Sequence, residues 1–172
     1  MKRGPLMVGL AVLFLGVMVG TAQAARPITL TFHEKNATET FHDVIPCIGG
    51  EGGAGATITT TENGVFHVTA AGIDDKGTPD PEDDEFIPPY HVTGTFTGTF
   101  EAVPDDPSLP TFTGHFTQWF GENSNTKNFA ATFTFTVIGT GSDGSTIKFH
   151  ETAHFSVSAQ GATVEFDKLR CF

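Results

Sequence analysis

The chain has 172 residues and a formal net charge of −11, from nine Lys and Arg against 20 Asp and Glu. Nucleic acids and anionic membrane surfaces bind to clustered basic residues, so this acidity argues against both as partners. The length is sufficient for one domain that buries a core of its own.

The first 24 residues have the pattern of a secretory signal peptide. Lys2 and Arg3 precede an apolar run over residues 6–19, and Ala22-Gln23-Ala24 is a small-x-small cleavage site. Cleavage after Ala24 would leave one domain over residues 25–172, which is 172 − 24 = 148 residues. We therefore expect a secreted, extracellular protein without membrane attachment after cleavage; the alternative is a retained anchor.

Two cysteines remain after that cleavage, Cys47 and Cys171. Neither belongs to a Cys-x-x-Cys motif, so a zinc or redox site has little support. In an oxidising compartment the simplest prediction is one disulfide between them, which would tie an early segment to the C-terminus.

Alternating apolar and polar residues predict short early strands at 28–32, 38–45, 56–61 and 65–70. Glu62-Asn63-Gly64 lies between the last two and has the character of a hairpin turn. A three-residue loop would pair Ile58 with Val68 and would require Gly64 in the left-handed conformation.

Residues 72–89 are expected to form one long irregular, acidic loop. Loops of this length in a compact domain are usually functional or disordered. Carboxylate oxygens are calcium ligands, but the spacing fits no calcium loop, so a solvated flap is the preferred interpretation. The weak calcium candidates are Asp80, Glu82, Asp83 and Asp84.

Four long strands, at 90–100, 111–120, 128–137 and 146–157, form the centre of the chain, and a last strand is expected at 162–168. One face of the central strands alternates Phe with Gly or Ala, which suits large side chains packed between small ones. Ser142-Asp143-Gly144 predicts a three-residue loop that pairs Val137 with Phe149. In the last strand, Val164 and Phe166 are expected to point inward.

Eight or nine antiparallel strands with no helical segment predict an all-β fold. An up-and-down β-barrel is the preferred architecture, and a two-sheet β-sandwich is the alternative.

Most histidines fall on the polar face of the strands, where no three converge, so no metal site and no cofactor are expected. Motifs for a serine hydrolase, a metalloprotease or a paired-carboxylate glycosidase are absent from the sequence, which leaves enzymatic activity uncertain and less favoured than binding.

Gln118 and Glu151 fall on the face that is otherwise Phe, Gly and Ala. A carboxylate there must be paired, protonated or hydrated. One hypothesis is a barrel cavity in which polar groups orient a ligand; the alternative is a bulge or a wet position near the barrel mouth. The register expected from the sequence places the two residues on different levels. The candidate ligand-binding residues are Gln118, Glu151, Phe96, Phe116, Phe135 and Phe149.

The runs at 91–100, 113–121 and 139–145 resemble a group of uncharacterised secreted proteins of actinobacterial type. Architecturally the strand order is similar to lipocalin, avidin and allene-oxide-cyclase-like barrels, whose functional motifs do not match here. The resemblance implies a barrel and no particular activity.

Three hypotheses for function follow. The first is a secreted barrel that binds a small apolar or amphipathic ligand in a Phe-lined cavity, with residues 72–89 as a gate. The second is a non-catalytic structural or interaction protein whose barrel is filled by its own side chains. The third is a barrel cyclase or isomerase that uses Glu151 as an acid or base.

Overall fold

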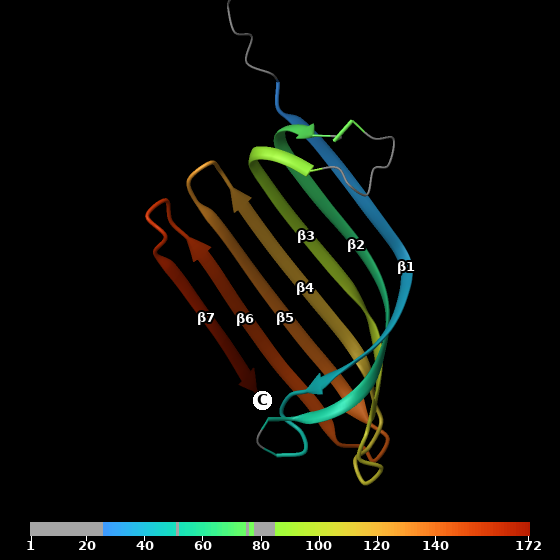
Figure 1. Ribbon diagram of the computed structural model, residues 1–172. Helices are drawn as coiled ribbons and strands as arrows, with labels where there is room; N and C mark the ends of the chain where they lie inside the picture. The colour runs from blue at the N-terminus through green and yellow to red at the C-terminus, as the bar shows by residue number, and fades with distance from the viewer. Residues whose placement is uncertain (1–25, 51, 75, 78–84) are drawn as a thin grey trace, which may run out of the picture.

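The computed structural model describes residues 26–50, 52–74, 76–77 and 85–172. Seven strands form one antiparallel sheet in which each strand pairs with the next along the chain (Figure 1). The strands are β1 (Ile28–Ile45), β2 (Ala54–Asp74), β3 (Glu85–Pro104), β4 (Phe112–Ser124), β5 (Phe129–Gly141), β6 (Thr146–Val157) and β7 (Thr163–Cys171).

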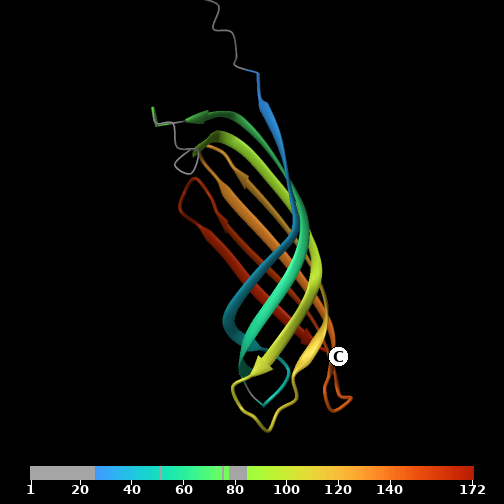
Figure 2. The ribbon, with the colours of Figure 1, turned by 90° about the vertical axis from the view of Figure 1, so that its right-hand side faces the viewer.

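The sheet is strongly twisted and curved, with one concave and one convex face (Figures 1 and 2). The all-β, up-and-down architecture is confirmed, and the strands belong to one sheet rather than to two. β1 and β7 are not hydrogen-bonded to each other, so the sheet is not closed into a barrel. The described residues form no helix, and hence none long and apolar enough to cross a membrane.

The hairpin expected at Glu62-Asn63-Gly64 is wrong, because β2 runs through these residues without a turn. Ile58 pairs with Phe41 and Ala102, not with Val68. A three-residue hairpin loop and an uninterrupted strand put the same residues on the same face, so alternation alone does not separate them. β1 likewise joins two expected strands into one, which reduces the eight or nine expected strands to seven.

Strands β2 and β3 extend into the segment 72–89, which was expected to be one long loop. Gly72, Ile73 and Asp74 pair with Ile87, Phe86 and Glu85, so both ends of the segment belong to β2 and β3. The apolar side chains of Ile73, Phe86 and Ile87 favour strand pairing despite the neighbouring acids. The calcium candidates Asp80, Glu82, Asp83 and Asp84 lie outside the described residues, as does the middle of the expected gate, residues 75 and 78–84.

The inward orientation expected for Val164 and Phe166 in the last strand is wrong, because both residues lie on the convex face. Glu165 and Asp167 pair with Phe155 and Ala153 on the concave face, while Phe166 stacks on His154 on the convex face, with ring centroids 5.5 Å apart. Because β7 is an edge strand and is exposed along its length, the apolar character of its residues does not decide which face they take.

Inward Phe rings lie over glycines of neighbouring strands. A Cβ added to Gly64 would collide with the ring of Phe96, and one added to Gly94 would collide with Phe120. This confirms the expected alternation of large and small side chains, and the close approach helps the sheet to curve. The buried core lies toward the Cys47 end of the sheet and contains Ile45, Ala56, Phe100, Ala102, Phe112, Phe116, Val137, Ile147 and Phe149.

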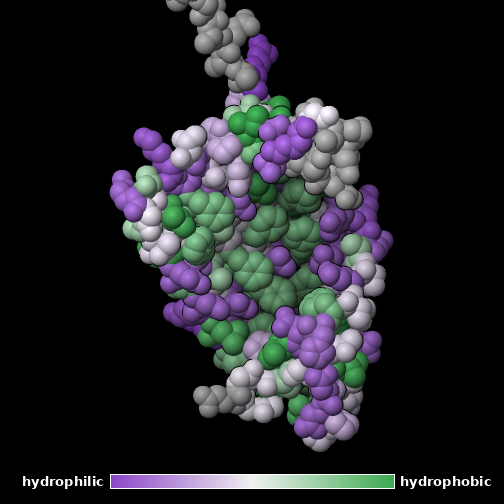
Figure 3. Space-filling view, in the orientation of Figure 1, coloured by the Kyte–Doolittle hydropathy of each residue, from purple (hydrophilic) through white to green (hydrophobic). Residues whose placement is uncertain are grey.

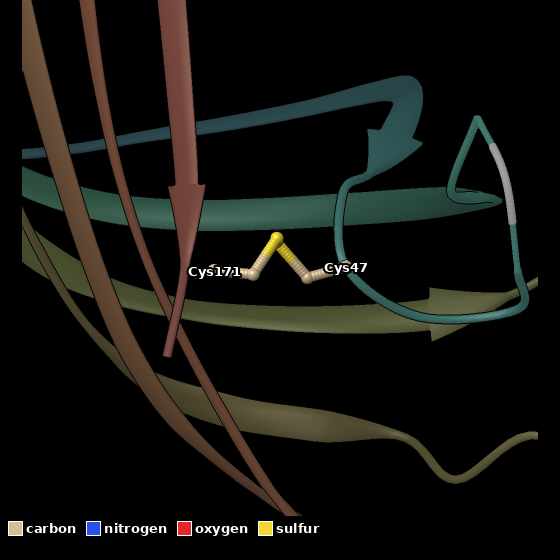
Figure 4. The surroundings of a disulfide bond; sticks show 2 residues. All are labelled: Cys47 and Cys171. Atoms are coloured by element: carbon tan, nitrogen blue, oxygen red, sulfur yellow. A yellow bond between two sulfur atoms is a disulfide. The ribbon is translucent and has the colours of Figure 1, made fainter.

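The disulfide between Cys47 and Cys171 is confirmed, with the two Cα atoms 5.8 Å apart. It joins the segment after β1 to the end of β7, across the side where the sheet is open (Figure 4). The first and last strands are therefore linked covalently at one end, although no backbone pairing joins them.

We expect the double variant Cys47→Ser/Cys171→Ser to lose about 4 kcal/mol of unfolding free energy, because the bridge closes a long loop of the unfolded chain. Urea titration followed by circular dichroism measures this loss. Reductant should lower the stability of the wild-type protein to that of the variant and leave the variant unchanged. Equal midpoints for oxidised wild type and variant would contradict the expectation.

Candidate functional site

The concave face contains a cavity of about 550 Å³. Side chains from all seven strands line it, including Phe41 of β1 and Leu169 of β7. In the space-filling view the hollow is lined by apolar residues and bordered on both sides by hydrophilic ones (Figure 3). The structure therefore has an accessible apolar hollow rather than an interior filled completely by its own side chains.

Phe135 is at the centre of an aromatic cluster in the cavity wall. Its ring centroid lies 5.7 Å from that of Phe116 and 6.0 Å from that of Phe149. Phe133 stacks on the other side, at 6.1 Å. Of the four expected aromatic ligand-binding residues, Phe116, Phe135 and Phe149 line the cavity. Phe96 lies beside it and stacks on Phe120, with centroids 6.0 Å apart.

Gln118 and Glu151 lie on the same level, contrary to the register expected from the sequence. Each is the direct neighbour of Phe135, one on β4 and the other on β6, and both line the cavity. The sequence interpretation paired Phe116 with Phe133, whereas Phe116 pairs with Val137. The difference arises at the β4–β5 turn, where the Asn125 side chain accepts hydrogen bonds of 2.9 Å from the N–H groups of Lys127 and Asn128.

Two further carboxylates, Asp43 of β1 and Asp167 of β7, line the cavity with Glu151. Partial burial raises the pKa of Glu151 above its ordinary value, and the negative charges of Asp167 and Asp43 raise it further. Three strands thus bring acidic groups to one hollow, on both sides of the opening between β1 and β7.

Other acidic groups lie along the same face. Partial burial, together with the charges of Glu34 and Glu39, raises the pKa of Glu62. Toward the other end of the sheet, the hydroxyl of Tyr90 donates a 2.6 Å hydrogen bond to Glu122, which raises the pKa of the tyrosine. The concave face therefore combines an aromatic surface with repeated negative charge.

The histidines lie on the convex face, as expected. His150 and His154 bond through Nδ1 to the hydroxyls of Thr136 and Thr132, both at 2.8 Å. His67 bonds in the same way to Thr31 at 3.0 Å. Among the residues that the structure describes, no group of three His, Cys, Asp or Glu side chains is placed to hold a metal ion.

Asp43 and Asp167 were missed as site residues by the sequence interpretation. For Asp167 the signal lies in the register of β7 rather than in the sequence alone. Cys171 pairs with Phe149, a concave-face residue, so alternation from Cys171 puts residues 169, 167 and 165 on that face too. For Asp43, the signal is its alternation with Phe41 and Ile45 in β1.

This arrangement can hold an apolar group against the Phe rings, offer the Gln118 amide as a hydrogen-bond partner and supply carboxyl groups. Comparison with protein families, with curated proteins and with solved structures gave no match to this chain.

We expect Glu151→Gln to stabilise the protein at pH 7 but not at pH 4. Because folding raises the pKa of Glu151, the folded protein binds this proton more tightly than the unfolded chain does. The free energy of unfolding therefore falls as pH rises from the ordinary glutamate value through the folded pKa. Solvent access limits the gain to less than about 1 kcal/mol.

Urea titrations at the two pH values measure this difference. Glu101→Gln, on the convex face, is the matched control and should change stability little. A gain for Glu151→Gln that is equal at both pH values would contradict the expectation.

Proposed function

We propose that this chain is a secreted protein that binds one small apolar or amphipathic molecule in the concave cavity. The observation that carries the proposal is the volume and lining of the hollow. A volume of about 550 Å³ is within the range of known small-molecule pockets, and its wall is mainly aromatic and aliphatic. The few polar groups, Gln118 and the carboxylates, would orient the ligand.

Secretion is supported by the signal-like residues 1–24 and is compatible with the disulfide. We propose that the sheet closes into the barrel expected from the sequence when a ligand is bound. Residues of β1 and β7 line the same cavity, and the disulfide joins the ends of this region, which supports an approach of the two edges over a ligand.

A second candidate function is non-catalytic interaction with another protein chain. The edge strand β7, which pairs only with β6, favours it, because Val164 and Phe166 on its convex face are 57% and 49% exposed. The cyclase or isomerase hypothesis is supported only by the raised pKa of Glu151 in the cavity wall.

A substitution that fills the cavity tests the proposal. Thr60 lines the hollow, whereas its neighbour Thr59 lies on the convex face, where its hydroxyl is 3.0 Å from that of Thr40. We expect Thr60→Trp to weaken binding of the neutral dye N-phenyl-1-naphthylamine at least about tenfold, because the indole would occupy the ligand's volume.

Fluorescence titration of the dye measures the affinities, and Thr59→Trp, the matched control, should bind as the wild type does. Absence of dye binding by the wild-type protein, or equal affinity in the two variants, would contradict the proposal.

A further inference from the structure

The two faces of the sheet differ in charge. The acidic strand residues on the concave face are Glu34, Glu39, Asp43, Glu62, Glu122, Glu151, Glu165 and Asp167. Of the basic strand residues with a register partner, Lys148, Lys168 and Arg170 all lie on the convex face. Lys35 falls in the β1 bulge, between the register pairs. Among the described strand residues that have a register partner, the concave face thus carries acidic side chains and no basic ones.

Around the cavity this negative charge is not neutralised. The side-chain carboxyl groups of Glu151 and Asp167 make no hydrogen bond or ion pair with any residue in the described part of the chain. The Asp43 carboxylate accepts a 2.7 Å hydrogen bond from the N–H of Val44, its neighbour in sequence. Partial burial and repulsion by Asp167 and Asp43 favour the protonated form of Glu151. A positive group inside the hollow would offset both effects by its attraction to the carboxylates.

We propose that the ligand is a cationic amphiphile, with its ammonium group among Asp43, Glu151 and Asp167 and its apolar body against the Phe135 cluster. This inference rests on the proposed function and specifies its ligand class. An ammonium group makes charge-assisted hydrogen bonds to carboxylates and is also attracted to the faces of aromatic rings. An anionic amphiphile such as a fatty acid would be repelled, and a neutral one would leave the carboxylates without a counter-charge.

A metal ion is a less suitable ligand for these three carboxyl groups than an ammonium group is. The acids that line the cavity come from three strands and do not form a metal-ligating group within the described residues. Calcium requires six to eight oxygen ligands at short, defined distances. An alkyl ammonium ion gains from several carboxylates at longer range, and it also uses the apolar wall, which a bare ion does not.

The test compares three probes with the same eight-carbon chain: octylammonium, 1-octanol and octanoate. Isothermal titration calorimetry at pH 7 and low salt should show octylammonium binding about tenfold or more tightly than 1-octanol, with octanoate weakest. In Glu151→Gln/Asp167→Asn, the advantage of octylammonium should fall below about threefold, while the affinity for 1-octanol stays within about twofold. Glu101→Gln, on the convex face, should behave as the wild type does.

Salt gives a second measurement that does not depend on the variants folding. In the wild-type protein, 0.5 M sodium chloride should weaken octylammonium binding several-fold and leave 1-octanol binding unchanged. Equal affinity for octylammonium and 1-octanol, or tighter binding of octanoate, would overturn the cationic ligand and leave the proposed apolar site in place. Absence of binding by all three probes would overturn both. A folded double variant that keeps the full preference would overturn the assigned carboxylates.

Discussion

The Cys47–Cys171 disulfide is the constraint on which the shape of this molecule most depends. β1 and β7 are the two edges of an open sheet, and no backbone hydrogen bonds hold them together. The bridge fixes the end of one near the end of the other, so that Asp43 and Asp167 line the same hollow. Without that link, the first and last strands would be connected only through the five strands between them.

Within the sheet, the pairing of Phe with Gly produces both the curvature and the cavity wall. Rings such as Phe96 and Phe120 lie over glycines on the adjacent strand, which removes side-chain bulk on one side of each contact. The turns that join β4, β5 and β6 set the register that leaves Gln118, Phe135 and Glu151 level on three neighbouring strands. Phe116, which lies over Gly98 in the same way, also lines the hollow, so one sequence pattern contributes to both the curvature and the candidate site.

Alternation in the sequence was sufficient to predict the central strands and the residues on each of their faces, whereas the facing of β7 was predicted wrongly. The Ser142-Asp143-Gly144 turn and the two cysteines predicted the β5–β6 connection and the disulfide. Val137 pairs with Phe149 as expected, because Ser142-Asp143-Gly144 defines that turn closely. The register between β4 and β5 was predicted wrongly, since a shift by an even number of residues keeps every side chain on its face. Only the turn geometry of Asn125 separates the alternatives. The continuous β2 was missed for a related reason, because alternation keeps its phase through Gly64.

Native mass spectrometry of the protein purified from its host's medium, compared with its denatured mass, tests the central claim most directly. The claim is that the Phe-lined hollow holds a small molecule. The account predicts a bound mass that is present under native conditions, is lost on denaturation and belongs to a molecule with an apolar body and an amine. Bare protein under both conditions would contradict the claim, whereas a bound anionic molecule would contradict only the predicted charge of the ligand.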